Sequence, residues 1–197
     1  MILVTDLSGV FFNKGLTLSV EILSKKYNLD PKKVRFVLNG TFAEKYRTGL
    51  VDTEVFWQEV KKELDIDNIE EFRQIFFDAY TPQQPYLDLI ANIRKQGIKV
   101  AYLSNSPEDR VRYLDEKFGF ISLFDFGLFS CEAHVRKPAK GIYENFLDKF
   151  DLKGEDVIYV DDKEENLIPA RELGMEAVHF VGEVEMRSDL RKMGINI

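Results

Sequence analysis

The N-terminal segment MILVTDLSGVFF, residues 1–12, contains the pattern that decides the fold. Residues 2–5 form a short apolar run of β-favouring side chains, and Asp6, Ser8 and Gly9 follow this run at once. Short apolar runs of this kind are typical of strands that are buried in a parallel sheet. The segment therefore predicts a buried strand that ends just before an acidic side chain.

Four further apolar runs resemble this first one, and they lie at residues 99–103, 126–129, 157–160 and 177–181. Helical periods of apolar residues lie between and after them, and three of these periods end at Gly97, Gly119 and Gly174. Glycine is the usual residue just beyond a helix C-terminus. Strands that alternate with helices predict an α/β fold with a parallel sheet.

The segment between the first two strands has a different pattern. Residues 16–80 lack strand signals and show consecutive helical periods, such as Phe56, Val60 and Leu64. Because this segment follows the first strand directly, it is expected to lie above the carboxyl edge of the sheet as a lid. We predict an α/β core domain, residues 1–15 and 81–197, and an all-helical cap domain, residues 16–80.

Composition excludes several classes of protein. The 197 residues include 34 acidic and 27 basic side chains, and the net charge of −7 has the wrong sign for a protein that grips nucleic acid through its overall field. One cysteine and two histidines cannot form an internal disulfide or a Cys/His zinc cage. No signal-peptide pattern or run of 18 apolar residues is present, so we expect a cytoplasmic protein with no membrane or nucleic-acid partner.

Polar side chains of distinct chemical types follow four of the predicted strands. They are Asp6 and Ser8, then Ser104 and Asn105, then Arg136 and Lys137 after a longer loop, and finally Asp161 and Asp162. The carboxyl ends of these strands converge on one crevice. A carboxylate nucleophile, a hydroxyl donor, a lysine and a carboxylate pair are what phosphoryl transfer through an aspartyl-phosphate with Mg²⁺ requires.

These residues resemble the four motifs of the haloacid dehalogenase-like superfamily, in the correct order. The motifs correspond to residues 6–10 (DLSGV), 103–105 (LSN), 136–138 (RKP) and 160–162 (VDD). Tyr143 and residues 161–166 and 169–175 are similar to the phosphatase domain of soluble epoxide hydrolases and to the bacterial glucose-1-phosphatase branch. The resemblance implies a Rossmann-like core with an inserted helical cap, and an Mg²⁺-dependent phosphatase that acts on a small phosphorylated metabolite.

The resemblance also implies roles for individual residues. Asp6 would be the nucleophile, and Lys137 would restrain it and neutralise the transferring phosphoryl group. Ser104 and Asn105 would hydrogen-bond that group, and the backbone N–H groups of Leu7 and Ser8 could cradle it. The implied metal ligands are Asp6, Asp162, the Ser8 carbonyl oxygen and, through water, Asp161.

One position departs from the family pattern and leaves the function open. Many family phosphatases have a second aspartate two residues after the nucleophile as general acid and base, but this chain has Ser8, a poor proton donor near neutrality. The chain is then a phosphatase for substrates with good leaving groups, an enzyme that dephosphorylates slowly, or a phosphate-binding regulatory protein. Haloacid dehalogenation is a more distant alternative, because adjacent carboxylates such as Asp161 and Asp162 favour a metal site.

Some other residues receive simpler structural interpretations. Arg136 is expected to be a solvated surface charge, since the resemblance assigns the catalytic role to the lysine before Pro138. Most of the aromatic side chains of the helical segment are expected to form the cap core, namely Phe36, Phe42, Tyr46, Phe56 and Trp57. The sequence does not indicate whether the protein is a monomer or a homodimer.

Overall fold

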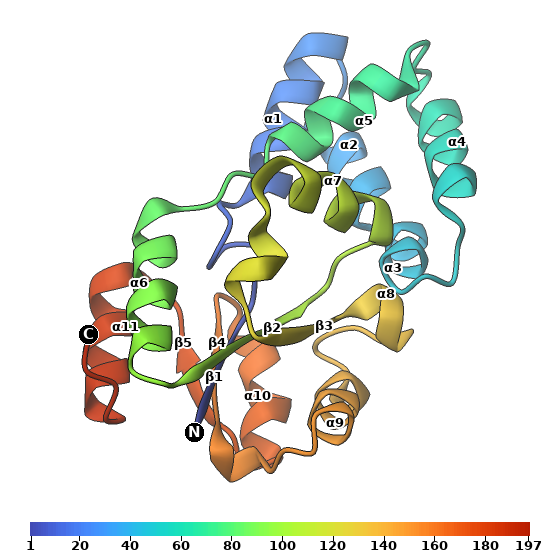
Figure 1. Cartoon of the computed structure of the whole chain (residues 1–197). Helices are drawn as coiled ribbons and strands as arrows, with labels where there is room; N and C mark the ends of the chain where they lie inside the picture. The colour runs from blue at the N-terminus through green and yellow to red at the C-terminus, as the bar shows by residue number, and fades with distance from the viewer.

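The computed structural model describes residues 1–197, and its core is one five-stranded parallel sheet in the order β3-β2-β1-β4-β5 (Figure 1). The strands are β1 (Ile2–Thr5), β2 (Lys99–Ser104), β3 (Phe126–Phe129), β4 (Val157–Asp161) and β5 (Glu176–His179). This arrangement confirms the predicted α/β class. Two strands run one residue further than expected, so Ser104 and Asp161 are the last residues of their strands.

Eleven helices accompany the sheet. Those between β1 and β2 are α1 (Gly15–Tyr27), α2 (Pro31–Asn39), α3 (Thr41–Arg47), α4 (Thr53–Leu64), α5 (Ile69–Asp78) and α6 (Gln84–Lys95). Those after β2 are α7 (Glu108–Phe118), α8 (Ser130–Ala133), α9 (Lys140–Lys149), α10 (Glu164–Glu172) and α11 (Glu183–Lys192). None of the helices combines the length and the apolar character that a membrane crossing requires.

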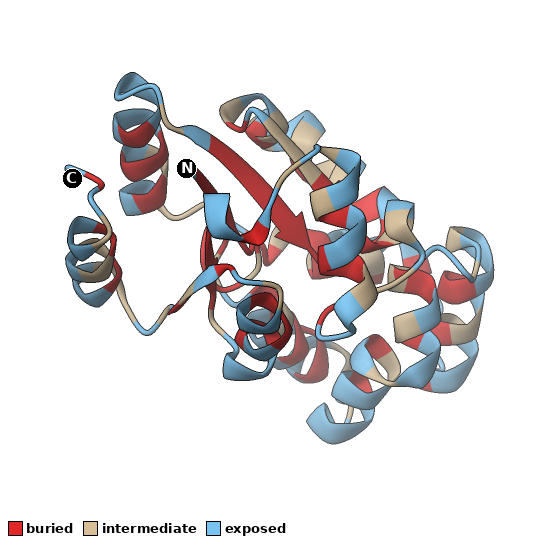
Figure 2. Cartoon of the chain, turned by 90° about the horizontal axis from the view of Figure 1, so that it is seen from below, coloured by how far each residue is buried: buried red, intermediate tan, exposed pale blue.

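The two faces of the sheet pack against different helices. Alternate residues of β1 point to opposite faces, because side chains along a strand alternate in direction. Ile2 and Val4 join the cluster formed with α9 and α10, whereas Leu3 joins the larger cluster that includes α6 and α11. Figure 2 shows the buried strands between helices whose inner faces are buried and whose outer faces are exposed. The sheet is therefore covered on both sides, as a parallel sheet requires.

Helices α1 to α5 gather beyond one end of the sheet and form the cap (Figure 1). Two of these helices begin at an aspartate N-cap. The side chain of Asp30 accepts a hydrogen bond from the N–H of Lys32 at the start of α2, and the side chain of Asp52 accepts one from the N–H of Glu54 at the start of α4. This segment is helical, as expected. The division at residues 15/16 and 80/81 into two domains stays a prediction.

The chain enters and leaves the cap through two segments that hydrogen-bond to each other. The N–H of Asn13 donates to the Thr81 carbonyl at 3.1 Å, and the Asn13 side chain donates to the Ala79 carbonyl at 3.0 Å. The N–H of Gln83 donates to the Phe11 carbonyl at 2.9 Å. These bonds fix the base of the cap directly above the end of β1.

Most of the five aromatic residues form part of the cap core, as predicted. Tyr46, Phe56 and Trp57 are buried, and the Tyr46 and Phe56 rings stack with centroids 3.9 Å apart. The two exceptions are Phe36, which is 73% exposed, and Phe42, which lies at the cap surface. Val34 and Leu38 fill the buried face of α2 instead, and Phe36 lies on the opposite side of that helix.

Candidate active site

The site is organised by Lys137, which is 1% exposed and lies beneath the end of the sheet's central strand. Its ammonium group donates to Asp6 Oδ1 at 2.8 Å and to Asp161 Oδ2 at 2.7 Å. It also contacts the Leu103 carbonyl at 2.7 Å and the Tyr159 hydroxyl at 2.8 Å. The structure thus brings together the lysine and two of the carboxylates that the sequence placed in one crevice.

The electrostatics of this group follow from burial and proximity. Burial raises the pKa of Asp6 to about 6, with Lys137 acting in the opposite direction. Burial also tends to lower the pKa of Lys137, but Asp161 and Asp6 outweigh it and raise that pKa above its ordinary value. The lysine is therefore a permanent cation beside Asp6.

Asp6 itself presents one oxygen for chemistry. Its Oδ1 is bound to Lys137, whereas its Oδ2 accepts no hydrogen bond from the protein. The backbone N–H of Asp6 donates to the Val160 carbonyl at 2.8 Å, which continues the β1–β4 pairing and fixes the direction of the side chain. A carboxylate that is fixed through one oxygen and free at the other is suited to attack an electrophile.

Asp161 is committed to holding the lysine. Its Oδ2 accepts from Lys137 and, at 2.5 Å, from the Tyr159 hydroxyl. Its Oδ1 accepts from the Lys163 N–H at 3.0 Å and from the Asn166 amide at 2.8 Å. Burial tends to raise the pKa of Asp161, but Lys137 outweighs burial and lowers that pKa. Protein donors thus engage both oxygens, and the expected contact of Asp161 with a metal through water stays a prediction.

Asp162 has the opposite environment and fits a cation. Its Oδ1 is buried and has no hydrogen-bond partner, and Lys14 Nζ lies 3.9 Å from its Oδ2. Burial and the neighbouring Asp161 raise its pKa. Oxygens of Asp6, Asp161 and Asp162 lie within 4.8 Å of one another. Hard divalent cations prefer such oxygen ligands, so these residues fit the predicted Mg²⁺.

Gly9 makes room for this carboxylate. Its φ is +94°, a conformation that favours glycine, and a Cβ atom built at Gly9 would lie 2.4 Å from Asp162 Oδ2. In the same turn, the N–H groups of Leu7 and Ser8 donate to no protein acceptor, while the N–H of Gly9 is bound to the Phe12 carbonyl. The turn after β1 therefore provides two free N–H donors beside Asp6, as expected for an anion cradle.

Asn105 of the second predicted motif hydrogen-bonds to the backbone of Lys137 in the third. The Asn105 amide donates to the Lys137 carbonyl at 2.9 Å, and its oxygen accepts from the Lys137 N–H at 2.9 Å. These two bonds hold the lysine backbone against the end of β2. Ser104 is buried, with its hydroxyl 3.1 Å from that of Ser106, and lies beside the cavity outside its lining. Phosphoryl binding by Ser104 and Asn105 stays a prediction.

A cavity of about 460 Å³ opens above these residues, between the cap and the core. Asp6, Ser8, Asn105, Lys137 and Asp162 line its core side. Leu16 and Leu38 contribute from the cap, with Phe76 and Tyr80. This volume is within the usual range for small-molecule sites, which is about 300 to 1,000 Å³.

Arg136 is not the solvated surface charge that the sequence predicts. Its guanidinium donates to Glu44 of α3 and, at 3.0 Å, to the Lys137 carbonyl, and it lines the cavity. The expectation was wrong because the charge has a partner in the cap, 92 residues away in the sequence. Arg136 therefore ties the lysine loop to the cap.

Tyr159 and Arg110 are among the site residues that the sequence interpretation missed. Tyr159 bonds both Lys137 and Asp161, yet within the sequence it is only one polar side chain in an apolar strand. Arg110 lines the cavity from α7, where it is one of several charged residues. No spacing pattern distinguishes either residue, because both act through neighbours that are distant in the chain.

Comparison with known proteins agrees with this geometry. A family model of haloacid dehalogenase-like hydrolases matches residues 14–174. The chain belongs to this family. The predicted membership, and with it the prediction of an enzyme, is confirmed. The haloacid dehalogenase-like hydrolase fold also explains the parallel sheet with helices inserted after β1.

The chain is similar to two curated proteins and, in its fold, to a solved structure. The sesquiterpene phosphatase astK of Aspergillus oryzae is 24% identical over 191 residues, which cover 95% of this chain and 93% of that protein. The bifunctional epoxide hydrolase 2 of Rattus norvegicus is 32% identical over 101 residues, which cover 49% of this chain and 18% of that longer protein. The structure of the HAD family enzyme bt-2542 from Bacteroides thetaiotaomicron, complexed with magnesium and inorganic phosphate, has a TM-score of 0.74 at 20% identity and covers 90% of this chain and 92% of that one.

Proposed function

We propose that this hydrolase is an Mg²⁺-dependent phosphatase that removes the phosphoryl group of a small metabolite through an aspartyl-phosphate on Asp6. The observation that supports the proposal most strongly is the state of the Asp6 carboxylate. One of its oxygens is fixed by Lys137 at 2.8 Å, and the other is unbonded at the floor of a cavity of about 460 Å³. A carboxylate with only a structural role would have both oxygens hydrogen-bonded to the protein, as Asp161 does.

The residues suggest a two-step reaction. In the first step, Asp6 Oδ2 forms a bond to phosphorus, and the bond from phosphorus to the leaving oxygen breaks with its electron pair on that oxygen. In the second step, water attacks phosphorus, inorganic phosphate leaves, one proton is released and the Asp6 carboxylate is regenerated. Lys137 stays bonded to Asp6 and stabilises negative charge on the transferring group, as do the free N–H groups of Leu7 and Ser8.

The residues that would hold Mg²⁺ are Asp6, Asp162 and the carbonyl oxygen of Ser8. When bound, the ion supplies electrostatic stabilisation of the phosphoryl oxygens and relieves the repulsion between the carboxylates. The unpartnered, buried Asp162 Oδ1 supports this assignment, because a buried carboxylate oxygen without a donor or cation is costly.

The site has no good proton donor for the leaving group at the position of Ser8. Ser8 lines the cavity where an acid would be useful, and a serine hydroxyl is a poor proton donor near neutrality. Loss of a general acid typically costs about 10²- to 10⁴-fold in rate. We therefore expect substrates whose leaving group departs without a proton, such as sugar 1-phosphates, acyl phosphates and aryl phosphates.

The similar proteins support the reaction class. The sesquiterpene phosphatase astK aligns along nearly the whole chain, and the structure of bt-2542 contains magnesium and inorganic phosphate. Phosphatase activity and Mg²⁺ binding are therefore both part of the function that we propose for this chain. A cytoplasmic location and the absence of nucleic-acid and membrane partners belong to the same proposal.

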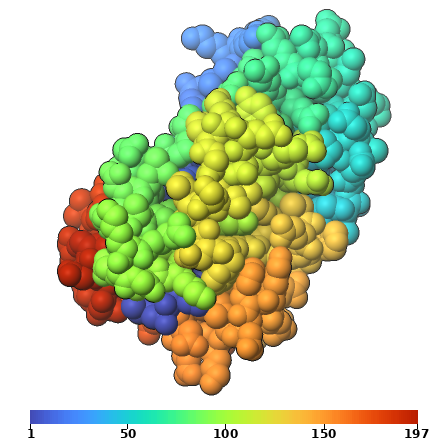
Figure 3. Space-filling model, in the orientation of Figure 1, coloured from blue at the N-terminus to red at the C-terminus, as the bar shows by residue number.

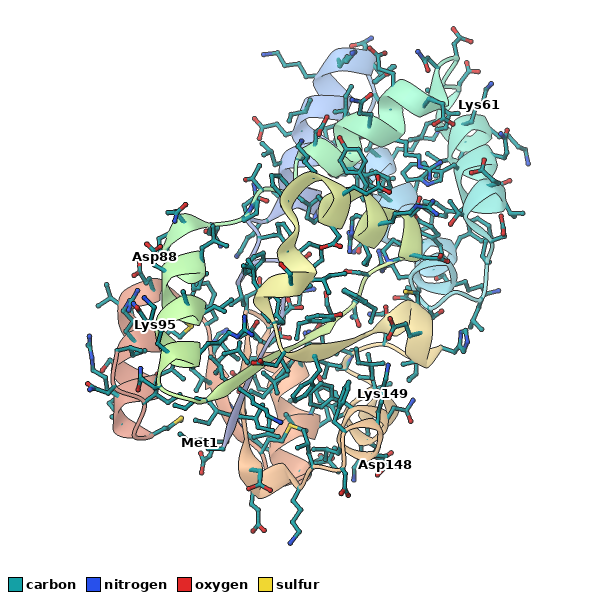
Figure 4. All side chains as sticks on the ribbon, in the orientation of Figure 1. Met1, Lys61, Asp88, Lys95, Asp148 and Lys149 are labelled. Atoms are coloured by element: carbon teal, nitrogen blue, oxygen red, sulfur yellow. The ribbon has the colours of Figure 1, made fainter.

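The test is hydrolysis of p-nitrophenyl phosphate and acetyl phosphate with Mg²⁺. Asp6→Asn is expected to abolish turnover, and excess EDTA is expected to abolish it in the wild type until Mg²⁺ is restored. The matched control is Asp148→Asn on α9, an exposed acid that Figure 4 shows at the far end of the core, which is expected to retain wild-type activity. Full activity of a folded Asp6→Asn variant would refute the nucleophile.

The serine at position 8 favours a second candidate function, which is binding without turnover. A protein with the phosphate cradle and without an acid at this position could bind a phosphorylated ligand as a regulatory protein. Calorimetric binding of inorganic phosphate by wild-type protein that hydrolyses none of the substrates, even at high enzyme concentration, would favour this second function over the first.

A further inference from the structure

The cavity above Asp6 has a charge opposite to that of the whole protein. The chain has a net charge of −7, yet the cavity lining includes seven lysine and arginine side chains and two aspartates. Some of this positive charge is neutralised locally: Lys137 by Asp6 and Asp161, and Arg136 by Glu44. A cleft lined mainly by one sign of charge concentrates ligands of the other sign.

Arg110 has no salt-bridge partner in the protein, although it is only 5% exposed. Its guanidinium donates to the Tyr80 hydroxyl at 2.9 Å, to the Asn105 carbonyl at 3.1 Å and to the Ser106 hydroxyl at 2.9 Å. All three acceptors are neutral. The preceding residue, Asp109, pairs with Arg73 at 3.1 Å instead.

Arg47 of α3 faces the same cavity from the cap and has no carboxylate partner either. Its guanidinium donates only to the carbonyls of Leu38 and Asn39, at 3.3 and 3.4 Å. Burial, followed by repulsion from Arg110 and Arg136, lowers its pKa to about 10. Arg47 is therefore repelled by two other guanidinium groups, and such an arrangement is costly without an anion nearby.

This positive charge exceeds what the transferring phosphoryl group needs at Asp6. That group already has Lys137, the free N–H groups of the turn after β1, and the predicted cation. The hydrogen bonds of the Arg47 guanidinium are all to atoms of the cap. It thus adds charge on the cap side of the cavity.

We propose that the substrate carries a second anionic group, a phosphate or carboxylate, and that Arg47 and Arg110 bind this group. The inference rests on the proposed function, because it describes the substrate of the same site. Guanidinium groups suit this task, since each presents several N–H donors in a planar fork that matches carboxylate and phosphate oxygens. The substrate class is then a small metabolite with two separated anionic groups, such as a sugar bisphosphate or a phosphorylated carboxylic acid.

The test compares paired probes that differ by one anionic group. Glucose 1,6-bisphosphate is compared with glucose 1-phosphate, and 3-phosphoglycerate with glycerol 3-phosphate. Dissociation constants are measured by calorimetry with Mg²⁺ in an Asp6→Asn background, which prevents turnover. In at least one pair, we expect the doubly anionic probe to bind about tenfold more tightly, as one charge-assisted bidentate contact provides.

Substitutions of the two arginines then test whether they cause the preference for the doubly anionic probe. Arg47→Gln is expected to reduce the affinity ratio from about ten to about one, and Arg110→Lys, which keeps the charge without the planar fork, to about three. Arg112→Gln is the matched control, because Arg112 is an exposed arginine of α7 outside this cavity. It should leave the ratio unchanged. If Arg110→Lys does not fold, as judged by circular dichroism, Arg47→Gln decides alone.

Two results would overturn the inference. One is an affinity ratio near one for both probe pairs before any arginine is changed. The other is an Arg47→Gln variant that binds both members of a pair more weakly by the same factor, because Arg47 would then serve the transferring phosphoryl group. Failure of the wild type to hydrolyse p-nitrophenyl phosphate contradicts the proposed function instead and leaves the affinity ratios as a separate result.

Discussion

One buried carboxylate binds three side chains of the cap from the core, and its removal gives a quantitative prediction. Asp109, at the start of α7, accepts hydrogen bonds from the Tyr46 hydroxyl of α3 and, at 2.9 Å, from the Trp57 indole of α4. Arg73 of α5 lies 3.1 Å from the same carboxylate. In Figure 3, the yellow-green segment around α7 lies against the blue-to-teal cap residues on one side and the rest of the core on the other.

Asp109→Ala is expected to lower the free energy of unfolding by about 3 kcal/mol. Breaking a buried ion pair from one side costs about 3 to 5 kcal/mol, and each buried donor left without an acceptor adds about 1 to 3 kcal/mol. We take the lower end because Arg73 also has Glu54 at 3.5 Å and its side chain is 16% exposed, so that water can partly replace the lost contact. For a domain of this size, the change corresponds to a fall in Tm of about 6 to 12 °C.

The assay is urea denaturation followed by fluorescence, with thermal unfolding as the second measurement. Asp189→Ala on α11 is the control, because its ion pair with Lys192 is exposed and such pairs contribute about 0 to 1 kcal/mol. A loss below about 1 kcal/mol for Asp109→Ala, with an unchanged m-value, would show that the junction does not hold the cap as described.

Three other substitutions test the site. Ser8→Asp is expected to raise the hydrolysis of alkyl phosphates by about 10²-fold, and that of p-nitrophenyl phosphate much less, because the aryl leaving group departs without a proton; equal rates in wild type and variant would mean that another group transfers the proton. Gly9→Ala is expected to raise the Mg²⁺ concentration needed for half-maximal activity, since the new Cβ would lie 2.4 Å from Asp162 Oδ2. The control is Gly97→Ala, because Gly97 also has a positive φ, +78°, but has nothing within 4 Å of its Cβ position, so that this variant shows the effect of backbone strain alone. Equal Mg²⁺ requirements in the two variants would contradict the proposed contact between residue 9 and Asp162. Tyr159→Phe removes the hydroxyl between Lys137 and Asp161 and is expected to lower the free energy of unfolding by about 1 to 2 kcal/mol, measured in urea; an unchanged value would show that this hydrogen bond contributes nothing net.

The sequence was informative where a pattern is local. The apolar runs identified all five strands, because buried parallel strands are nearly continuous in hydrophobic residues. Strand ends then located Asp6 and Asp161, and the loop after the third predicted strand located Lys137, since the topology of a parallel sheet brings its carboxyl ends together. The structure shows Lys137 in direct contact with both carboxylates.

The sequence was uninformative where a side chain acts through a distant partner. Two adjacent aspartates look equivalent in the sequence, yet Asp161 is enclosed by four donors while Asp162 has an unpartnered oxygen. Arg136 seemed a surface charge because its partner Glu44 is in the cap. The arginines of the cavity were missed for the same reason: a helical position predicts the face of a side chain only after the packing of its helix is known.

Trapping of the phosphorylated enzyme tests the central claim most directly. Wild-type protein is mixed with Mg²⁺ and acetyl phosphate, quenched in acid within milliseconds to seconds, and examined by peptide mass spectrometry. The predicted result is one phosphoryl group on the peptide that contains Asp6, lost on treatment with hydroxylamine and absent from the Asp6→Asn variant. Turnover of the substrate with the phosphoryl group on another residue, or steady turnover by Asp6→Asn, would contradict the account.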